Sequence, residues 1–183
     1  MVKNKGYTLI ELIIVIAIIG ILAGASFISI GVIRQAKRQE AVNTLDNQIS
    51  SLLVRTKALS DASNKNGDTP LCMVIRKRTD GKYAVMNGNI DESGILSVGD
   101  VNTDADCEAI LPKDIIQIKY VPSDSAQKAA AVGADNDDDL VIQFLKSYGS
   151  TQYGGGKYEV YIKGGRLYAT IYLDKVTGNH YIK

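Results

Sequence analysis

The feature that most constrains this chain is an uncharged stretch of 22 residues, from Leu12 to Ile33. As an α-helix it would be about 33 Å long, at about 1.5 Å per residue, which is enough for the hydrocarbon core of a bilayer. A core helix that is apolar on every side would need a far larger protein around it than 183 residues provide. The stretch therefore predicts a transmembrane segment.

A secretory signal peptide is the alternative interpretation of this stretch. The apolar part of such a signal runs about 7–15 residues, which is shorter than the stretch here. Residues 23–26 (AGAS) are nevertheless small enough to resemble a signal-peptidase site. Lys3 and Lys5 before the stretch are nearly balanced by three basic residues within Arg34–Arg38, so charge alone predicts no orientation.

An acidic residue, Glu11, lies at the start of the apolar run, directly after Leu9 and Ile10. A carboxylate within a membrane span costs about 2.5–3.5 kcal/mol on insertion scales. One interpretation is local, since Thr8 and Glu11 have the spacing of a capping box at a helix N-terminus. The other is a cationic partner from another subunit. A carboxylate has several acceptor sites, so the two roles are compatible.

The segment Lys5–Glu11 (KGYTLIE), followed by LIIVIAIIGILA, resembles the N-terminus of type IV pilins and pseudopilins. Their pattern is a short basic leader ending in Gly, an aromatic or apolar residue, Thr-Leu-Ile-Glu and an apolar helix. The match covers about the first 30 residues. The resemblance implies a cytoplasmic leader and a head outside the membrane.

The resemblance also implies specific chemistry at the leader. A prepilin peptidase would cleave after Gly6 and methylate the new amine of Tyr7, and a residue without Cβ allows close approach to the backbone. In the filament that amine would pair with Glu11 of an adjacent subunit, next to Thr8. A desolvated charge pair fixes register, because either partner alone is costly.

One position departs from the family pattern. Family members often have Pro at the position that matches Ile28, and Pro is absent here. The helix could instead bend or loosen at Gly20, Gly24 and Gly31, since Gly is a poor helix former. The departure leaves the geometry of the middle of the helix open and favours a minor pilin or pseudopilin slightly.

The helical pattern continues beyond the apolar stretch and predicts one helix from about Thr8 to about Leu59. A short coiled-coil stem is the alternative to packing on a sheet. The expected fold class is α+β, a long N-terminal helix packed against an antiparallel β-sheet head. The expected parts are a leader (1–6), a transmembrane or filament-core helix (7–33), its amphipathic continuation (34–60) and an extracellular head (61–183). The apolar stripe consists of Val42, Leu45, Ile49, Leu52, Thr56 and Leu59.

Alternating and β-rich segments predict the strands of the head, with a hairpin turn at Asp80-Gly81 and another at Gly164-Gly165. The second turn predicts that aliphatic side chains lie on one face and Tyr161, Tyr168 and Tyr172 on the other. The expected pairs are Ile162 with Leu167, Tyr161 with Tyr168 and Val160 with Ala169. The expected strands are Leu71–Arg78, Lys82–Met86, Ile115–Val121, Leu140–Lys146, Lys157–Lys163, Arg166–Leu173 and Asn179–Ile182.

Two cysteines, Cys72 and Cys107, lie in the part expected to be exported. An even number in an oxidising compartment predicts one disulfide, with two free thiols as the alternative. The bond would close a loop of about 36 residues and stabilise the head by roughly 3–4 kcal/mol.

Two loops resemble binding motifs only weakly. Oxygen ligands alternate in the first as in calcium loops, but the turn Gly is replaced by Ala105 and the final acid by Leu111. A solvated acidic loop is the other interpretation, and residues 135–139 repeat the pattern with the same omissions. The segment Gly154–Lys157 lacks the first Gly and the final hydroxyl of a phosphate loop. The calcium candidates are Asp100, Asn102, Asp104 and Asp106.

No nucleophile–base–orienter set is evident, and His180 is the single histidine, so we expect neither an enzyme nor a cofactor. A net charge of +1 gives no case for specific nucleic-acid binding. The expected protein is a structural subunit of a type IV pilus-like filament. Its partners would be its own copies, the prepilin peptidase and an inner-membrane assembly platform.

We expect a single-pass protein of the cytoplasmic membrane that later moves to the cell surface in the pilus, where this family serves adhesion and twitching motility. The first alternative is a minor pilin or pseudopilin of a type II secretion or DNA-uptake machine. The second is a lone membrane-anchored binding or enzymatic domain.

Overall fold

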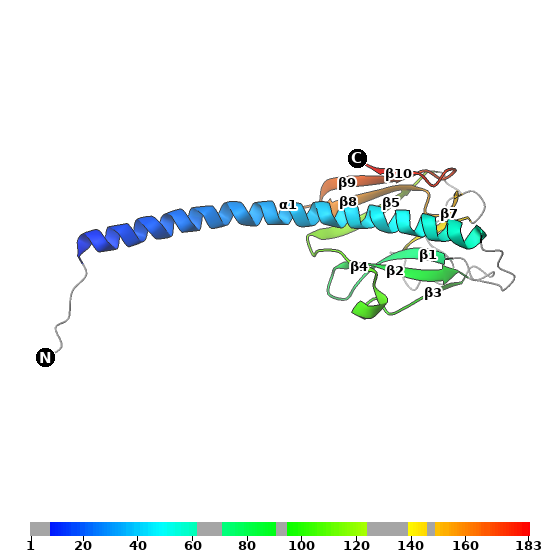
Figure 1. The fold of residues 1–183 in the computed structure, drawn as a ribbon, viewed down its shortest axis with the longest axis horizontal. Coiled ribbons are helices and arrows are strands. Elements are labelled where there is room, and N and C mark those ends of the chain that lie inside the picture. The colour runs from blue at the N-terminus through cyan, green and yellow to red at the C-terminus, as the bar shows by residue number, and fades with distance from the viewer. Residues whose placement is uncertain (1–7, 62–70, 91–94, 124–138, 146–148) are drawn as a thin grey trace. The chain divides into compact units, whose positions relative to one another are not determined.

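The computed structural model describes residues 8–61, 71–90, 95–123, 139–145 and 149–183. The chain divides into two compact units, Met1–Lys37 and Arg38–Lys183, and each is described by itself below. The expected α+β class is confirmed for the second unit, in which the helix that begins near the N-terminus packs on antiparallel sheets (Figure 1).

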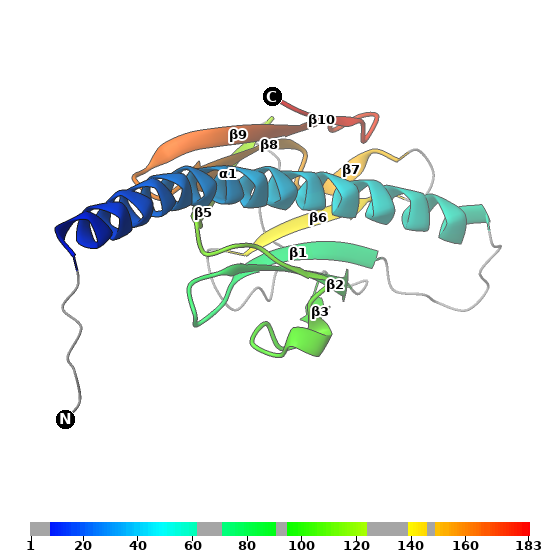
Figure 2. The same ribbon diagram turned by 60° about the vertical axis from the view of Figure 1, so that its left-hand side comes forward.

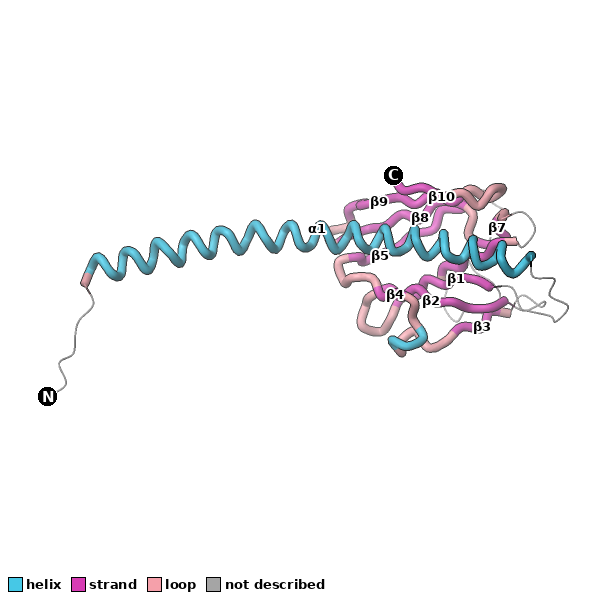
Figure 3. The backbone as a smooth tube through the Cα atoms, viewed as in Figure 1, coloured by secondary structure: helices cyan, strands magenta, loops and turns pink. Residues whose placement is uncertain are grey.

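A single helix, α1, runs from Leu9 to Asp61 (Figure 3). It begins one residue after the predicted start and ends two residues after the predicted end. The helix continues through Gly20, Gly24 and Gly31, where an added Cβ would meet no atom within 4 Å. The glycines therefore do not end the helix.

No helix in the part of the chain that the structure describes is long and apolar enough to cross a membrane.

The part of α1 that belongs to the head buries the predicted stripe. Val42, Leu45, Ile49 and Leu52 are each at most 3% exposed, and Thr56 is also buried. The four aliphatic side chains pack into one core with side chains from both sheets, and burial of each stabilises the folded head by about 1.5–3 kcal/mol. The sheets occupy the stripe, so the coiled-coil stem is wrong. The side chain of Leu59 lies outside the described residues.

The head contains two antiparallel sheets where we expected one (Figure 2). The six-stranded sheet has the order β3-β2-β1-β6-β7, with β4 paired to β2. The four-stranded sheet has the order β10-β9-β8-β5. The first comprises β1 Leu71–Lys77, β2 Tyr83–Ile90, β3 Leu96–Val98, β4 Ala109–Ile110, β6 Leu140–Phe144 and β7 Thr151–Tyr153, and the second β5 Ile115–Pro122, β8 Gly156–Ile162, β9 Arg166–Leu173 and β10 His180–Ile182.

The hairpin at Gly164-Gly165 differs from its predicted register. Ile162 pairs with Arg166 and Tyr161 with Leu167, whereas Val160 pairs with Ala169 as predicted. A bulge between these pairs takes up the one-residue difference.

The bulge changes the direction of one predicted surface tyrosine. Tyr168 packs against the main core, and its hydroxyl donates to Gln39 Oε1 of α1 at 3.4 Å. The predicted tyrosine face is therefore wrong for Tyr168. The predicted turn at Asp80-Gly81 is confirmed. It connects the antiparallel strands β1 and β2, and the Gly81 N–H donates to the Arg78 carbonyl within it.

Candidate functional site at the start of the helix

Thr8 and Glu11 form a reciprocal capping box at the start of α1. Glu11 Oε2 accepts hydrogen bonds from the Thr8 backbone N–H at 3.0 Å and from the Thr8 hydroxyl at 3.1 Å. The Glu11 N–H donates to Thr8 Oγ1 at 3.4 Å. The box satisfies donors that a helix start leaves without partners, and it places the carboxylate at the positive end of the helix dipole.

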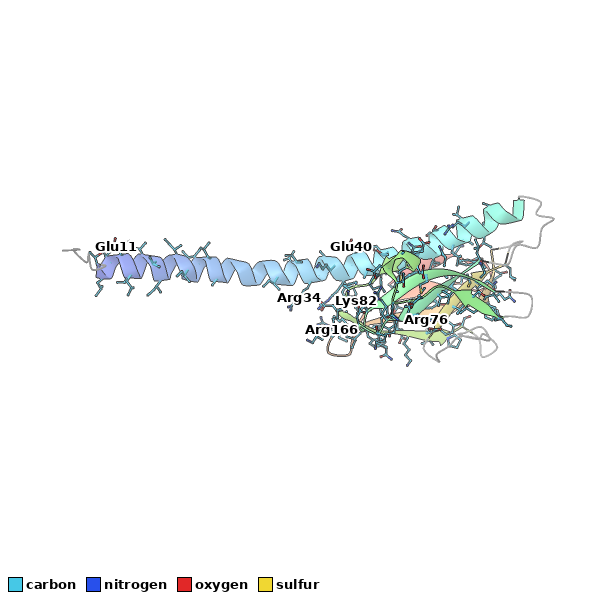
Figure 4. The ribbon with its side chains drawn as sticks, turned by 90° about the horizontal axis from the view of Figure 1, so that it is seen from below. Glu11, Arg34, Glu40, Arg76, Lys82 and Arg166 are labelled. Atoms are coloured by element: carbon cyan, nitrogen blue, oxygen red, sulfur yellow. The ribbon has the colours of Figure 1, made fainter. Side chains whose placement is uncertain are left out.

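The carboxylate of Glu11 keeps acceptor capacity for a further partner. Both of its hydrogen bonds use Oε2, and the residues that the structure describes donate none to Oε1. Glu11 is exposed in the isolated chain and lies in the first turn of α1 (Figure 4). The local role therefore leaves room for a role between subunits. The two residues of the predicted cleavage site, Gly6 and Tyr7, lie outside the described residues.

The helix beyond this cap presents apolar side chains on every side. All described side chains in residues 8–24 and 30–37 are exposed, and Leu9 reaches 77% and Ile10 65%. An apolar surface of this extent is typical of a protein–protein or membrane interaction site. The described residues of this unit provide no such cover.

The two cysteines are free thiols in the structure. Cys72 of β1 is fully buried, and burial raises the pKa of its thiol to about 12. Cys107 is half-buried and donates to the carbonyls of Val101 and Thr103. The two belong to adjacent apolar clusters that share Val98. The disulfide stays a prediction.

The candidate calcium loop is held by its own hydrogen bonds. Asp100 Oδ1 accepts from the Asn102 N–H, Asp106 Oδ2 accepts from the Asp100 N–H, and Asp104 pairs with Arg78 at 2.7 Å. Among the described residues, no group of three or more His, Cys, Asp or Glu side chains is placed to hold a metal ion. Of the second acidic run only Asp139 lies in the described part.

The three-glycine segment before Lys157 is fixed by tyrosines, although the sequence predicted only a loop between strands. The Tyr158 hydroxyl is buried and donates to the Gly154 carbonyl at 2.6 Å. The Tyr120 hydroxyl donates to the Gly155 carbonyl at 2.8 Å. Sequence reasoning missed both bonds, because Tyr120 and Tyr158 come together only through the pairing of β5 with β8.

Comparison with known proteins gives a match at the start of the chain. Residues 1–27 match a family model described as the prokaryotic N-terminal methylation motif. The matched residues include the capping box and more than half of the uncharged stretch. The chain matches no curated protein and no solved structure.

Proposed function

We propose that this chain, which carries the N-terminal methylation motif that is the hallmark of type IV pilin-like and prepilin-like proteins, is a structural subunit of an extracellular type IV pilus-like filament. The observation that carries the proposal is the exposed apolar helix behind a single capped carboxylate. Such a helix is stable where lipid or other copies cover it.

The first step is residence in the cytoplasmic membrane. Support comes from the 22 uncharged residues between Leu12 and Ile33, which match the thickness of a bilayer core. The head, with its buried core between α1 and two sheets, would fold on the outer side.

The second step is processing by a prepilin peptidase. The peptidase would cut between Gly6 and Tyr7 and methylate the Tyr7 amine. Removal of the leader takes away Lys3 and Lys5 and leaves a cationic amine close to the apolar helix. The chain is the substrate of this reaction.

The third step is docking of the processed subunit through its helix. The apolar side chains would pass from lipid to the helices of neighbouring copies. Glu11 Oε1 would accept the Tyr7 amine of an adjacent subunit, while Thr8 continues to hold Oε2. Loss of one partner from a buried ion pair costs about 3–5 kcal/mol, so the pair would select one register.

A minor pilin or pseudopilin is the second candidate. The absence of Pro at Ile28 favours it, since it departs from the common pattern. The two candidates share the processing and docking steps and differ in abundance. If the chain is a main filament subunit, it should dominate filaments sheared from the cell surface. Its presence as a trace component, or only in the envelope, would favour the second candidate.

A further inference from the structure

A cleft of about 250 Å³ opens in the head beside the four-stranded sheet. Strands β5, β8, β9 and β10 all contribute to it, and they lie side by side in Figure 1. Its volume is slightly below the range of about 300–1,000 Å³ typical of small-molecule sites. The residues that line the cleft include Pro122, Ser123, Lys157, Tyr172, Lys175 and Tyr181.

Two stacked tyrosines form one wall of the cleft. Tyr172 of β9 and Tyr181 of β10 are directly paired across the strands. Their ring centroids lie 4.8 Å apart and the ring planes differ by 5°. Tyr181 is 60% exposed, because β10 is the edge strand of its sheet. The stack therefore offers a rigid, partly exposed aromatic surface.

A lysine is held on this aromatic wall. Lys157 of β8 pairs with Tyr172 across the strands, and its ammonium lies 5.3 Å from the centre of the Tyr172 ring. The cation–π contact fixes the ammonium and leaves its N–H groups able to donate. Lys175 adds a second positive charge to the lining.

The carboxylate that lines the cleft already has other partners. Asp174 Oδ1 accepts from the backbone N–H groups of Val176 and Thr177 and from the Thr177 hydroxyl. These hydrogen bonds lower the pKa of Asp174. The carboxylate therefore stays ionised and holds its own turn, and the Lys157 ammonium supplies N–H donors on the aromatic wall.

We propose that this cleft binds an acidic sugar residue of a polysaccharide. One face of a pyranose ring is lined by C–H groups and would lie against the Tyr181 ring. The sugar carboxylate would accept hydrogen bonds from the Lys157 ammonium. The Ser123 hydroxyl, which donates to the Gly155 carbonyl at 3.2 Å, would accept a hydrogen bond from a sugar hydroxyl.

The same sheet face disfavours a long nucleic acid. A single strand needs a continuous positive track beside its aromatic platforms. In the row next to the tyrosines, Lys119 is paired with Glu159 across β5 and β8, and Glu159 also accepts from the Tyr161 hydroxyl at 2.7 Å. The Glu159 carboxylate therefore interrupts the positive charge beside the cleft, which suits one acidic ring better than a long polyanion.

The test uses the full-length chain in detergent micelles, titrated calorimetrically with a hyaluronan tetrasaccharide, which carries uronic acids. Neutral chitotetraose and an oligothymidylate serve as comparison ligands. We expect the acidic tetrasaccharide to bind in about the millimolar to submillimolar range, and at least about tenfold more tightly than either comparison ligand.

Three variants assign the binding to the cleft. Tyr181→Ala and Lys157→Gln should each weaken binding about tenfold, while Tyr161→Ala, a tyrosine outside the cleft, should leave it unchanged. Both Tyr181 and Lys157 have exposed side chains and lose only a contact with Tyr172, so each variant should lower the melting temperature by a few degrees at most. No binding, equal binding of the neutral sugar, preference for the oligothymidylate, or insensitivity to both cleft variants would overturn the proposal. None of these results bears on filament assembly, because the assay uses unassembled protein.

Discussion

The Arg76 guanidinium contacts the Asp139 carboxylate at two points inside the head, Nε to Oδ1 at 2.8 Å and Nη2 to Oδ2 at 2.6 Å. The carboxylate is 1% exposed. The pair joins β1 to the residue immediately before β6, and Figure 4 labels Arg76 in the head. A pair in this position costs desolvation, so each partner depends on the other.

Removal of one partner should therefore destabilise the head strongly. We expect Asp139→Ala to lower the free energy of unfolding by about 3–5 kcal/mol, measured by urea denaturation. The double variant Arg76→Met with Asp139→Leu should recover most of that loss, because apolar replacement of a buried pair is often close to neutral. If Asp139→Ala were as stable as the parent, the Arg76 guanidinium would not depend on Asp139, and the account of the buried pair would be contradicted.

Gly154 should tolerate a side chain less well than Gly164. Both have positive φ, +82° and +94°, so Ala at either position incurs about 1–2 kcal/mol of backbone strain. A Cβ on Gly154 would also collide with the Tyr158 hydroxyl and lie 2.6 Å from the Val141 carbonyl oxygen, whereas Gly164 has open space. Gly154→Ala should therefore cost a further 1–3 kcal/mol or so in thermal denaturation. If Gly154→Ala and Gly164→Ala lowered the free energy of unfolding equally, the close packing around Gly154 would be contradicted.

The thiols should differ in reactivity while the head remains reduced. Burial raises the pKa of Cys72 to about 12, so at pH 8 almost no thiolate is present there. We expect iodoacetamide to modify Cys107 well before Cys72, which should react only on unfolding. Equal labelling rates under native conditions would contradict the buried position of Cys72.

In the exported protein we expect one Cys72–Cys107 disulfide, which non-reducing peptide mapping would detect within a single chain. The expectation rests on the even number of cysteines in a head that would lie outside the cytoplasm, and both are free thiols in the structure. Two thiols that are both alkylated in native surface protein would contradict it.

Local patterns predicted much of this fold. The stripe from Val42 to Thr56 is periodic, so the helix and its buried face could be predicted. Seven strands follow from their β-rich runs, but β3, β4 and β7 have only two or three residues each and carry too little pattern. The bulge near Tyr168 could not be predicted, because a two-residue turn with alternating side chains indicates an uninterrupted register.

The start of the chain could also be predicted in part. The spacing of Thr8 and Glu11 indicated the capping box, which the structure confirms. The cleft beside Tyr172 and Tyr181 was missed, because it requires the pairing of β8, β9 and β10.

Processing should leave Tyr7 as the first residue, with a methylated amine. Mass spectrometry of protein from the envelope and from sheared filaments would detect this terminus. Gly6→Val should block maturation, since a β-branched side chain would hinder approach of the peptidase to the backbone, and unprocessed protein should accumulate in the membrane. An intact Met1 in assembled protein, or a new terminus near Ala25, would contradict this step.

The role of Glu11 between subunits can be separated from its role in the cap. Glu11→Gln keeps a capping-box side chain, so the start of the helix should lose about 1 kcal/mol at most. Thr8→Val is the matched control, because it removes the capping hydroxyl and keeps the Glu11 charge. If capping were the whole role of Glu11, the two variants should assemble about equally well.

The most direct measurement is the yield of sheared filaments relative to the processed membrane pool in cells that express Glu11→Gln. A cation left without its partner in an apolar filament core costs about 3–5 kcal/mol, which corresponds to a factor of more than about 100 at each docking step. We therefore predict normal membrane insertion and processing but few or no filaments for Glu11→Gln, and filaments for Thr8→Val. A normal yield of filaments from fully processed Glu11→Gln protein would contradict the pairing of Glu11 with Tyr7 and leave Glu11 as a helix cap alone.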